Sequence, residues 1–108
     1  MKKILIANDL PGIGKVALAP AIPIFACCQI ETILLPTVLL SSHTGGFNNI
    51  AIAEQTEFMR QSLYQWENLE LKPDAVLTGY FRNPEQIELM VDTIEKLSTS
   101  TKLFVDPI

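Results

Sequence analysis

Four short apolar runs, separated by longer segments of helical character, constrain the fold of this chain more than any other feature. A continuous apolar run of this kind is typical of a strand buried on both faces of a sheet. Each parallel connection needs a crossover of a dozen or more residues, so the alternation predicts an α/β fold, a three-layer sandwich with a mostly parallel sheet. The predicted strands are Ile4–Ala7, Glu31–Leu40, Ala75–Gly79 and Lys102–Val105, with an irregular point near Pro36.

Three segments between these runs predict helices. The first, from Gly14 to about Gln29, is rich in small and apolar residues. The second carries apolar side chains at alternating steps of four and three, which places them on one helical stripe. The third has the clearest start, because Asn83 is a natural N-cap, Pro84 takes the first helical position and Gln86 completes a capping-box pattern. The stripe of the second helix is formed by Ile52, Thr56, Met59, Leu63 and Trp66.

Composition and charge exclude several classes of protein. With 48% hydrophobic and 19% charged residues, the chain is composed like a folded globular domain. Its formal net charge of −4 provides no basic surface for nucleic acid or an anionic membrane. The apolar stretch Val16–Cys28 is shorter than the roughly 20 residues that span a bilayer. The adjacent Cys27 and Cys28 predict buried thiols in a reducing compartment, so we expect a cytoplasmic protein.

The loop after the first predicted strand invites comparison with phosphate-binding loops. Asn8–Gly14 contains a proline and two glycines, and Lys15 follows the second glycine. A Walker A motif requires a glycine where Asp9 stands and a serine or threonine where Val16 stands. We therefore expect a tight turn here and no phosphate loop.

Polar or aromatic side chains lie at or shortly after the carboxyl ends of all four predicted strands, at Asn8-Asp9, Ser42-His43-Thr44, Gly79-Tyr80 and Asp106. In open α/β sheets, ligands bind outside the carboxyl ends of the strands. We therefore expect these side chains to converge at one rim of the sheet. The candidate site residues among them are Asp9, His43, Thr44, Tyr80 and Asp106.

Each of these residues also has an ordinary structural interpretation. The hydroxyls and the imidazole of Ser41–Gly46 can orient a heteroaromatic ring, or they can cap the next helix. Tyr80 and Phe81 can wall a flat ligand or cover the end of the sheet. Asp106, followed by proline, can bind Mg²⁺ or form a turn. His43 is the sole histidine and no Gly-x-Ser-x-Gly elbow is present, so a hydrolase triad has little support.

Taken together, four segments resemble the pyridoxine/pyridoxal kinase family of the ribokinase-like superfamily. They occur in the family's order over the whole chain, and Ser-x-His-Thr-Gly is the most specific of their motifs. The segments are Asn8–Gly14, Leu40–Gly46, Leu77–Tyr80 with Asn83-Pro84 after it, and Val105–Pro107.

The resemblance implies transfer of the γ-phosphoryl group of ATP to the 5′-hydroxyl of pyridoxal, pyridoxine or pyridoxamine. It implies that Asp9, His43 and Thr44 contact the pyridine ring and that Tyr80 lines the same pocket. It places Asp106 near the ATP phosphates and Mg²⁺. It also suggests a homodimer.

Family members continue beyond the Asp-Pro motif and carry their general base in a later Gly-[Ala/Thr]-Gly-Asp segment, which this sequence lacks. Residues 1–108 are therefore expected to be the amino-terminal part of a single ribokinase-like kinase domain, incomplete at its carboxyl side. Because phosphoryl transfer depends on positioning and charge stabilisation around the moving group, we expect no useful turnover from this chain alone. Two alternatives remain: a hydroxymethylpyrimidine kinase, and a small α/β binding module without catalytic activity.

Overall fold

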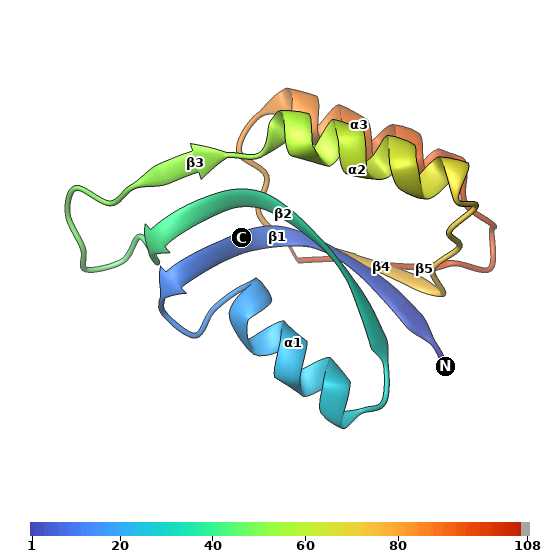
Figure 1. The fold of residues 1–108 in the computed structure, drawn as a ribbon, viewed down its shortest axis with the longest axis horizontal. Helices are drawn as coiled ribbons and strands as arrows, with labels where there is room; N and C mark the ends of the chain where they lie inside the picture. The colour runs from blue at the N-terminus through green and yellow to red at the C-terminus, as the bar shows by residue number, and fades with distance from the viewer. Residues whose placement is uncertain (107–108) are drawn as a thin grey trace.

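A five-stranded sheet with helices on both faces organises the chain (Figure 1). The computed structural model describes residues 1–106. The strand order is β3-β2-β1-β4-β5, and only β3 pairs antiparallel with its neighbour, so the predicted α/β class with a mostly parallel sheet is confirmed. The strands are β1 (Lys3–Ile13), β2 (Glu31–Ser42), β3 (Ile52–Glu54), β4 (Ala75–Thr78) and β5 (Lys102–Val105), and the helices are α1 (Leu18–Cys27), α2 (Thr56–Asn68) and α3 (Pro84–Glu95).

Strand β1 lies at the centre of the sheet and is buried on both faces, as its continuous apolar run predicts. Ile4 and Ile6 pack beneath α1 in one apolar cluster. Leu5 and Ala7 belong to the cluster on the opposite face, beneath α2 and α3. The two clusters explain why consecutive residues of this strand are all apolar.

The prediction of a loop over Asn8–Gly14 is wrong for most of its length, because β1 continues to Ile13. Its partner β2 also continues, to Ser42, and the two strands stay paired after β4 has ended. The register shifts between Asn8 and Leu10, opposite the segment that follows Pro36, which confirms the irregular point predicted there. Beyond Ala7 the strand has one free edge, where a proline such as Pro11 is tolerated.

The first two helices begin later than the sequence pattern indicates. Gly14 has φ 118° and Ala17 has φ 57°, so α1 starts only at Leu18. Ile52 was expected on the stripe of the second helix, but it lies in β3, where it pairs with Leu40 of β2. Helix α2 therefore begins at Thr56.

Helix α3 begins as predicted, with Asn83 as its N-cap. The Asn83 Oδ1 atom accepts a hydrogen bond from the Gln86 backbone N–H at 2.9 Å. In a capping box the Gln86 side chain would bond the N–H of Asn83. Instead, its Oε1 atom accepts from the N–H of Arg82 at 2.8 Å, one residue earlier.

The expectation of buried cysteines is wrong, because Cys27 and Cys28 are both exposed. They lie at the carboxyl end of α1, a helix that buries only Leu18 and Ala21 against the sheet. Among residues 1–106, no helix combines the length and the apolar composition that crossing a membrane requires. Pro107, part of the predicted Asp-Pro turn, lies outside the described residues.

Candidate functional site

The connections that leave β1 and β4 run to opposite faces of the sheet (Figure 1). The chain leaves β1 for α1 on one face and leaves β4 for α3 on the other. Neighbouring parallel strands with this property define a topological switch point, where open α/β sheets bind their ligands. The residues at this switch point are Asn8 and Asp9 on β1, and Gly79 and Tyr80 after β4.

Asn8 joins the two sides of the switch point. Its Oδ1 atom accepts hydrogen bonds from the backbone N–H groups of Asp9 and Tyr80, each at 2.9 Å. A Cβ atom on Gly79 would lie 2.4 Å from Asn8 Cγ, so a side chain at this position cannot coexist with the present position of Asn8. Two predicted site residues, Asp9 and Tyr80, therefore share one anchor.

A buried polar network holds the backbone of Tyr80 from its other side. The Thr37 hydroxyl donates to the Tyr80 carbonyl oxygen at 2.8 Å. The carbonyl oxygen of Thr37 in turn accepts from the Gln86 Nε2 atom at 2.8 Å, and Gln86 also donates to the hydroxyl of Thr56 at 3.1 Å. Since Thr37 and Gln86 are both fully buried, the network fixes the loop after β4 to β2, α2 and α3.

The two aromatic residues after β4 have different environments. The Tyr80 side chain is half-buried, and its hydroxyl accepts a hydrogen bond from the exposed Arg82 guanidinium at 3.2 Å. Phe81 packs against the apolar cluster beneath α2 and α3. Phe81 thus covers the end of the sheet, and Tyr80 is the aromatic residue with a polar atom near the switch point.

Asp9 is a half-buried carboxylate at the switch point. Burial raises the pKa of its carboxyl group above the usual value, and the nearby backbone N–H of Asp9, which itself donates to Asn8, partly opposes this effect. None of the ion pairs formed within residues 1–106 involves Asp9. Its carboxylate oxygens therefore remain able to accept hydrogen bonds from a ligand.

His43 and Thr44 lie further along the sheet, at the tip of the arm formed by β1 and β2. The backbone N–H of His43 donates to the Ile13 carbonyl oxygen at 2.9 Å, and the imidazole stacks edge-to-face on Phe47 with ring centroids 4.9 Å apart. Thr44 is exposed. Ile13 comes four residue steps after Asp9 along the strand, a distance of about 13 Å. The five predicted residues share an edge of the sheet but divide into two groups along it.

The ordinary interpretation of the loop after β2 was that its side chains cap the next helix. This interpretation is wrong. Helix α2 has Gln55 at its N-cap position, with no capping hydrogen bond from a side chain. The Ser41 hydroxyl instead accepts from the backbone N–H of Ala51 at 2.9 Å. This bond ties the end of β2 to the segment that leads into β3.

Asp106 follows β5 on the far side of β4. Its backbone N–H donates to the Thr78 carbonyl oxygen at 2.9 Å, and its side chain is exposed. Within residues 1–106, no group of three or more His, Cys, Asp or Glu side chains could hold a metal ion. Mg²⁺ prefers an octahedral shell that includes waters and substrate phosphates, so Asp106 fits as one oxygen ligand and not as a complete site.

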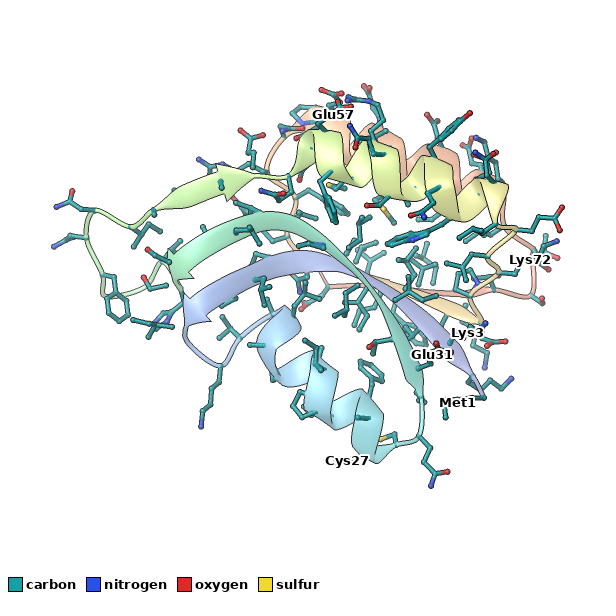
Figure 2. The ribbon with its side chains drawn as sticks, viewed as in Figure 1. Met1, Lys3, Cys27, Glu31, Glu57 and Lys72 are labelled. Carbon is teal, nitrogen blue, oxygen red and sulfur yellow. The ribbon has the colours of Figure 1, made fainter. Side chains whose placement is uncertain are left out.

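Two cavities, of about 580 and 670 Å³, lie at the opposite end of the sheet from the switch point. Trp66 and Lys96 line the first, Phe25 and Phe104 line the second, and Lys72 lines both. In Figure 2, the labelled Lys3, Glu31 and Lys72 mark this end of the sheet, away from the arrowheads of β1 and β2. None of the five predicted site residues lines either cavity.

Sequence reasoning missed the residues that organise the switch point. Asn8 directly follows the apolar run of the first strand, and a polar residue in that position was a usable signal. Thr37 lies inside an apolar stretch and Gln86 was assigned to a capping box, so neither gave a signal of its contacts across the fold.

Comparison with known proteins identifies similar solved structures. No family model matches the chain, and neither does any curated protein. A Bacteroides thetaiotaomicron protein provisionally named a phosphomethylpyrimidine kinase, solved with pyridoxal, is 33% identical, with a TM-score of 0.91 over 97% of this chain. Pyridoxal kinase from Lactobacillus plantarum is 28% identical, with a TM-score of 0.91 over 98% of this chain.

More distant structures share the fold. Pyridoxal kinase from Leishmania donovani, solved with ADP and pyridoxamine, has a TM-score of 0.88 over 98% of this chain at 19% identity. The present chain spans 37% of the Bacteroides protein, 38% of the Lactobacillus protein and 39% of the Leishmania protein. The resemblance seen in the sequence is therefore confirmed: the chain has the ribokinase-like fold of part of the pyridoxal kinases and phosphomethylpyrimidine kinases.

Proposed function

We propose that this chain supplies the vitamin-binding part of an ATP-dependent kinase that phosphorylates the 5′-hydroxyl of pyridoxal, pyridoxine or pyridoxamine. The observation that supports this most is the coupling of Asp9 and Tyr80 through Asn8 at the switch point. The 33% identity to a protein solved with pyridoxal adds the class of ligand.

The proposed pocket extends from the switch point along the arm of β1 and β2. Asp9 offers carboxylate acceptors to polar groups of the pyridine ring, and Tyr80 offers an aromatic face with a hydroxyl. His43 and Thr44 would hold the other end of the ligand, which must then lie along the arm. Asp106 would stand on the side of the pocket where phosphoryl transfer takes place.

Asp106 alone does not make a binding site for ATP and Mg²⁺. When bound, Mg²⁺ would neutralise charge on the phosphates, and Asp106 would contribute one oxygen to its coordination shell. The sequence contains no Gly-x-Gly-Asp segment to provide a general base. The 108 residues are therefore expected to bind the vitamin without phosphorylating it.

Phosphorylation of hydroxymethylpyrimidine is the second candidate, because the Bacteroides relative is provisionally named for that substrate class. A direct test is isothermal titration of the full chain with pyridoxine and, separately, with hydroxymethylpyrimidine. Pyridoxine is preferable to pyridoxal here, since an aldehyde would also react with lysine side chains. A preference of about tenfold or more for the pyrimidine would select the second candidate.

Substitution of tyrosines provides the matched control for this titration. Tyr80→Ala should weaken pyridoxine binding about tenfold, because it removes the aromatic wall and its hydroxyl. Tyr64 is a 68% exposed residue on α2, and Tyr64→Ala should leave the affinity unchanged. Equal effects of the two substitutions, or no binding of either ligand by the unaltered chain, would contradict the proposed function.

A further inference from the structure

We propose that Asn8 is a positioning residue, whose single carboxamide oxygen fixes Asp9 and Tyr80 relative to each other across the switch point. The inference rests on the proposed function in one respect, namely that Asp9 and Tyr80 contact the substrate. The anchoring itself rests on hydrogen bonds within this chain.

The carboxamide oxygen of Asn8 extends the pairing of β1 and β4 by one bond. The Gly79 N–H donates to the Ala7 carbonyl oxygen at 2.8 Å, in line with the ladder between the two strands. The following residue, Tyr80, donates its N–H to the side chain of Asn8 and not to a backbone carbonyl oxygen of β1. An amide oxygen has two lone pairs, and the N–H of Asp9 occupies the second.

Gly79 holds the Asn8 side chain in this orientation. An added Cβ at residue 79 would lie 2.4 Å from both Cγ and Nδ2 of Asn8, and 2.6 Å from Oδ1. The φ angle of Gly79 lies outside the left-handed region, so the glycine is required for space and not for backbone conformation. Alanine at this position would displace the Asn8 side chain without straining the main chain.

Thr37 holds the backbone of Tyr80 from the side opposite to Asn8. Its hydroxyl bonds the carbonyl oxygen of Tyr80, while Asn8 bonds the N–H. Because the N–H and the carbonyl oxygen of Tyr80 are both hydrogen-bonded, the Cα atom that carries its side chain is fixed relative to β1 and β2. Loss of the Asn8 oxygen would free Tyr80 and Asp9 at the same time, although they are far apart in the sequence.

Amide hydrogen exchange of the full chain tests this anchor without requiring activity. Asn8→Leu removes the acceptor at similar size, and Asn8→Asp retains an oxygen acceptor. We expect Asn8→Leu to accelerate exchange at both Asp9 and Tyr80 about tenfold, with Ile6 and Val76 unchanged and Asn8→Asp close to the unaltered chain. Gly79→Ala should reproduce the effect, and it serves in place of Asn8→Leu if that variant does not fold.

Pyridoxine binding to the same variants provides the second measurement. Asn8→Leu should raise the dissociation constant about tenfold, and Asn8→Asp should restore most of the affinity. The proposal is overturned if exchange at Asp9 and Tyr80 is unchanged in Asn8→Leu, or if only one of the two residues responds. If the unaltered chain binds no pyridoxine, the proposed function fails, while the exchange rates still decide whether Asn8 is the anchor.

Discussion

Gly14 allows His43 to lie against the turn that follows β1. Its φ of 118° is rarely adopted by other residues, and an added Cβ would lie 2.5 Å from His43 Nδ1. Gly14→Ala combines backbone strain with a collision, so it should lower the free energy of unfolding by roughly 1–3 kcal/mol. Urea denaturation measures the effect.

Gly45→Ala is the matched control for this substitution. The nearest atom to a Cβ at Gly45 is 3.9 Å away, and this residue has no left-handed φ. Its stability should change by less than about 0.5 kcal/mol. Similar losses for Gly14→Ala and Gly45→Ala would show that the contact with His43 is unimportant.

The half-buried carboxyl of Asp9 makes stability depend on pH. Burial raises its pKa in the folded chain above the unfolded value of 3.8, so the folded state binds this proton more tightly. The associated stability is fully present below pH 3.8 and is lost as the pH rises through the folded pKa. Asp9→Asn should therefore stabilise the chain near neutral pH, by less than about 1 kcal/mol because the group is partly solvated.

Urea denaturation of this variant and of the unaltered chain, below pH 3.8 and near neutral pH, checks the sign. The advantage of Asp9→Asn should shrink on acidification. Asp92→Asn, on the exposed surface of α3, serves as the control for loss of a carboxylate. If the stability advantage of Asp9→Asn instead grows on acidification, burial does not determine the direction of the Asp9 pKa shift.

Individual candidate site residues could be predicted only where an apolar run in the sequence marks the end of a strand. Asp9 and Tyr80 were predicted in this way, since each follows an apolar run closely, and the structure places both at the switch point. Thr37 could not be found, because its role depends on Tyr80, 43 residues later. Cys27 and Cys28 were mispredicted, since an apolar sequence does not reveal which side of a helix faces the sheet.

At the scale of elements, α3 is joined to β2 and α2 by the buried side chain of Gln86. Its Nε2 atom donates to the Thr37 carbonyl oxygen and the Thr56 hydroxyl, and its Oε1 atom accepts from Arg82. Gln86→Leu keeps the volume but leaves these partners unsatisfied, which should destabilise the chain by about 1–3 kcal/mol. Thermal or urea denaturation provides the measurement.

Gln65→Leu is the control, since Gln65 is an exposed residue of α2. It should change the free energy of unfolding by less than about 0.5 kcal/mol. If Gln86→Leu is as stable as the unaltered chain, the polar network between α3 and β2 does not contribute to stability.

Most element types were predictable from the sequence, and β5 was predicted with both of its ends, but the ends of β1, α1 and α2 were not. The start of α3 was located because Asn83 and Pro84 are local signals. The continuation of β1 to Ile13 was missed because its proline and glycines suggest a turn, whereas pairing with β2 determines the strand. The three-residue β3 is entirely exposed and leaves no apolar alternation to detect.

At the scale of the whole molecule, β5 is one edge of the described sheet, and three of its four residues are apolar. Leu103, Phe104 and Val105 are 48%, 51% and 63% exposed, and within residues 1–106 all of β5 pairs along one side only, with β4. An exposed apolar edge strand promotes association between chains. We expect the chain to self-associate with increasing concentration, and Val105→Lys to reduce this association.

Sedimentation velocity over a range of concentrations measures this behaviour. Val91→Lys introduces the same charge at a 45% exposed position on α3 and should leave the association unchanged. A chain that stays monomeric at every concentration would show that the described edge of β5 is not a site of association.

The architecture of the whole molecule was the most predictable level. Alternating strands and helices fix a parallel sheet, because each crossover needs a helix on one face. The convergence of the five candidate site residues was less predictable, because the strands end at different positions along the strand direction. β1 extends about 20 Å beyond Ala7, where β4 ends, and carries the segment near His43 away from Asp9.

The switch point and the adjoining arm are proposed to bind a vitamin B6 molecule. The most direct measurement is a titration of the ¹⁵N-labelled full chain with pyridoxine, followed by amide chemical shifts. We predict saturable shifts at Asp9, His43, Thr44 and Tyr80, with none at Trp66 or Phe104 beside the two cavities. Shifts confined to the cavities, or no saturable shift at any residue, would mean that the vitamin does not bind at the switch point and the arm.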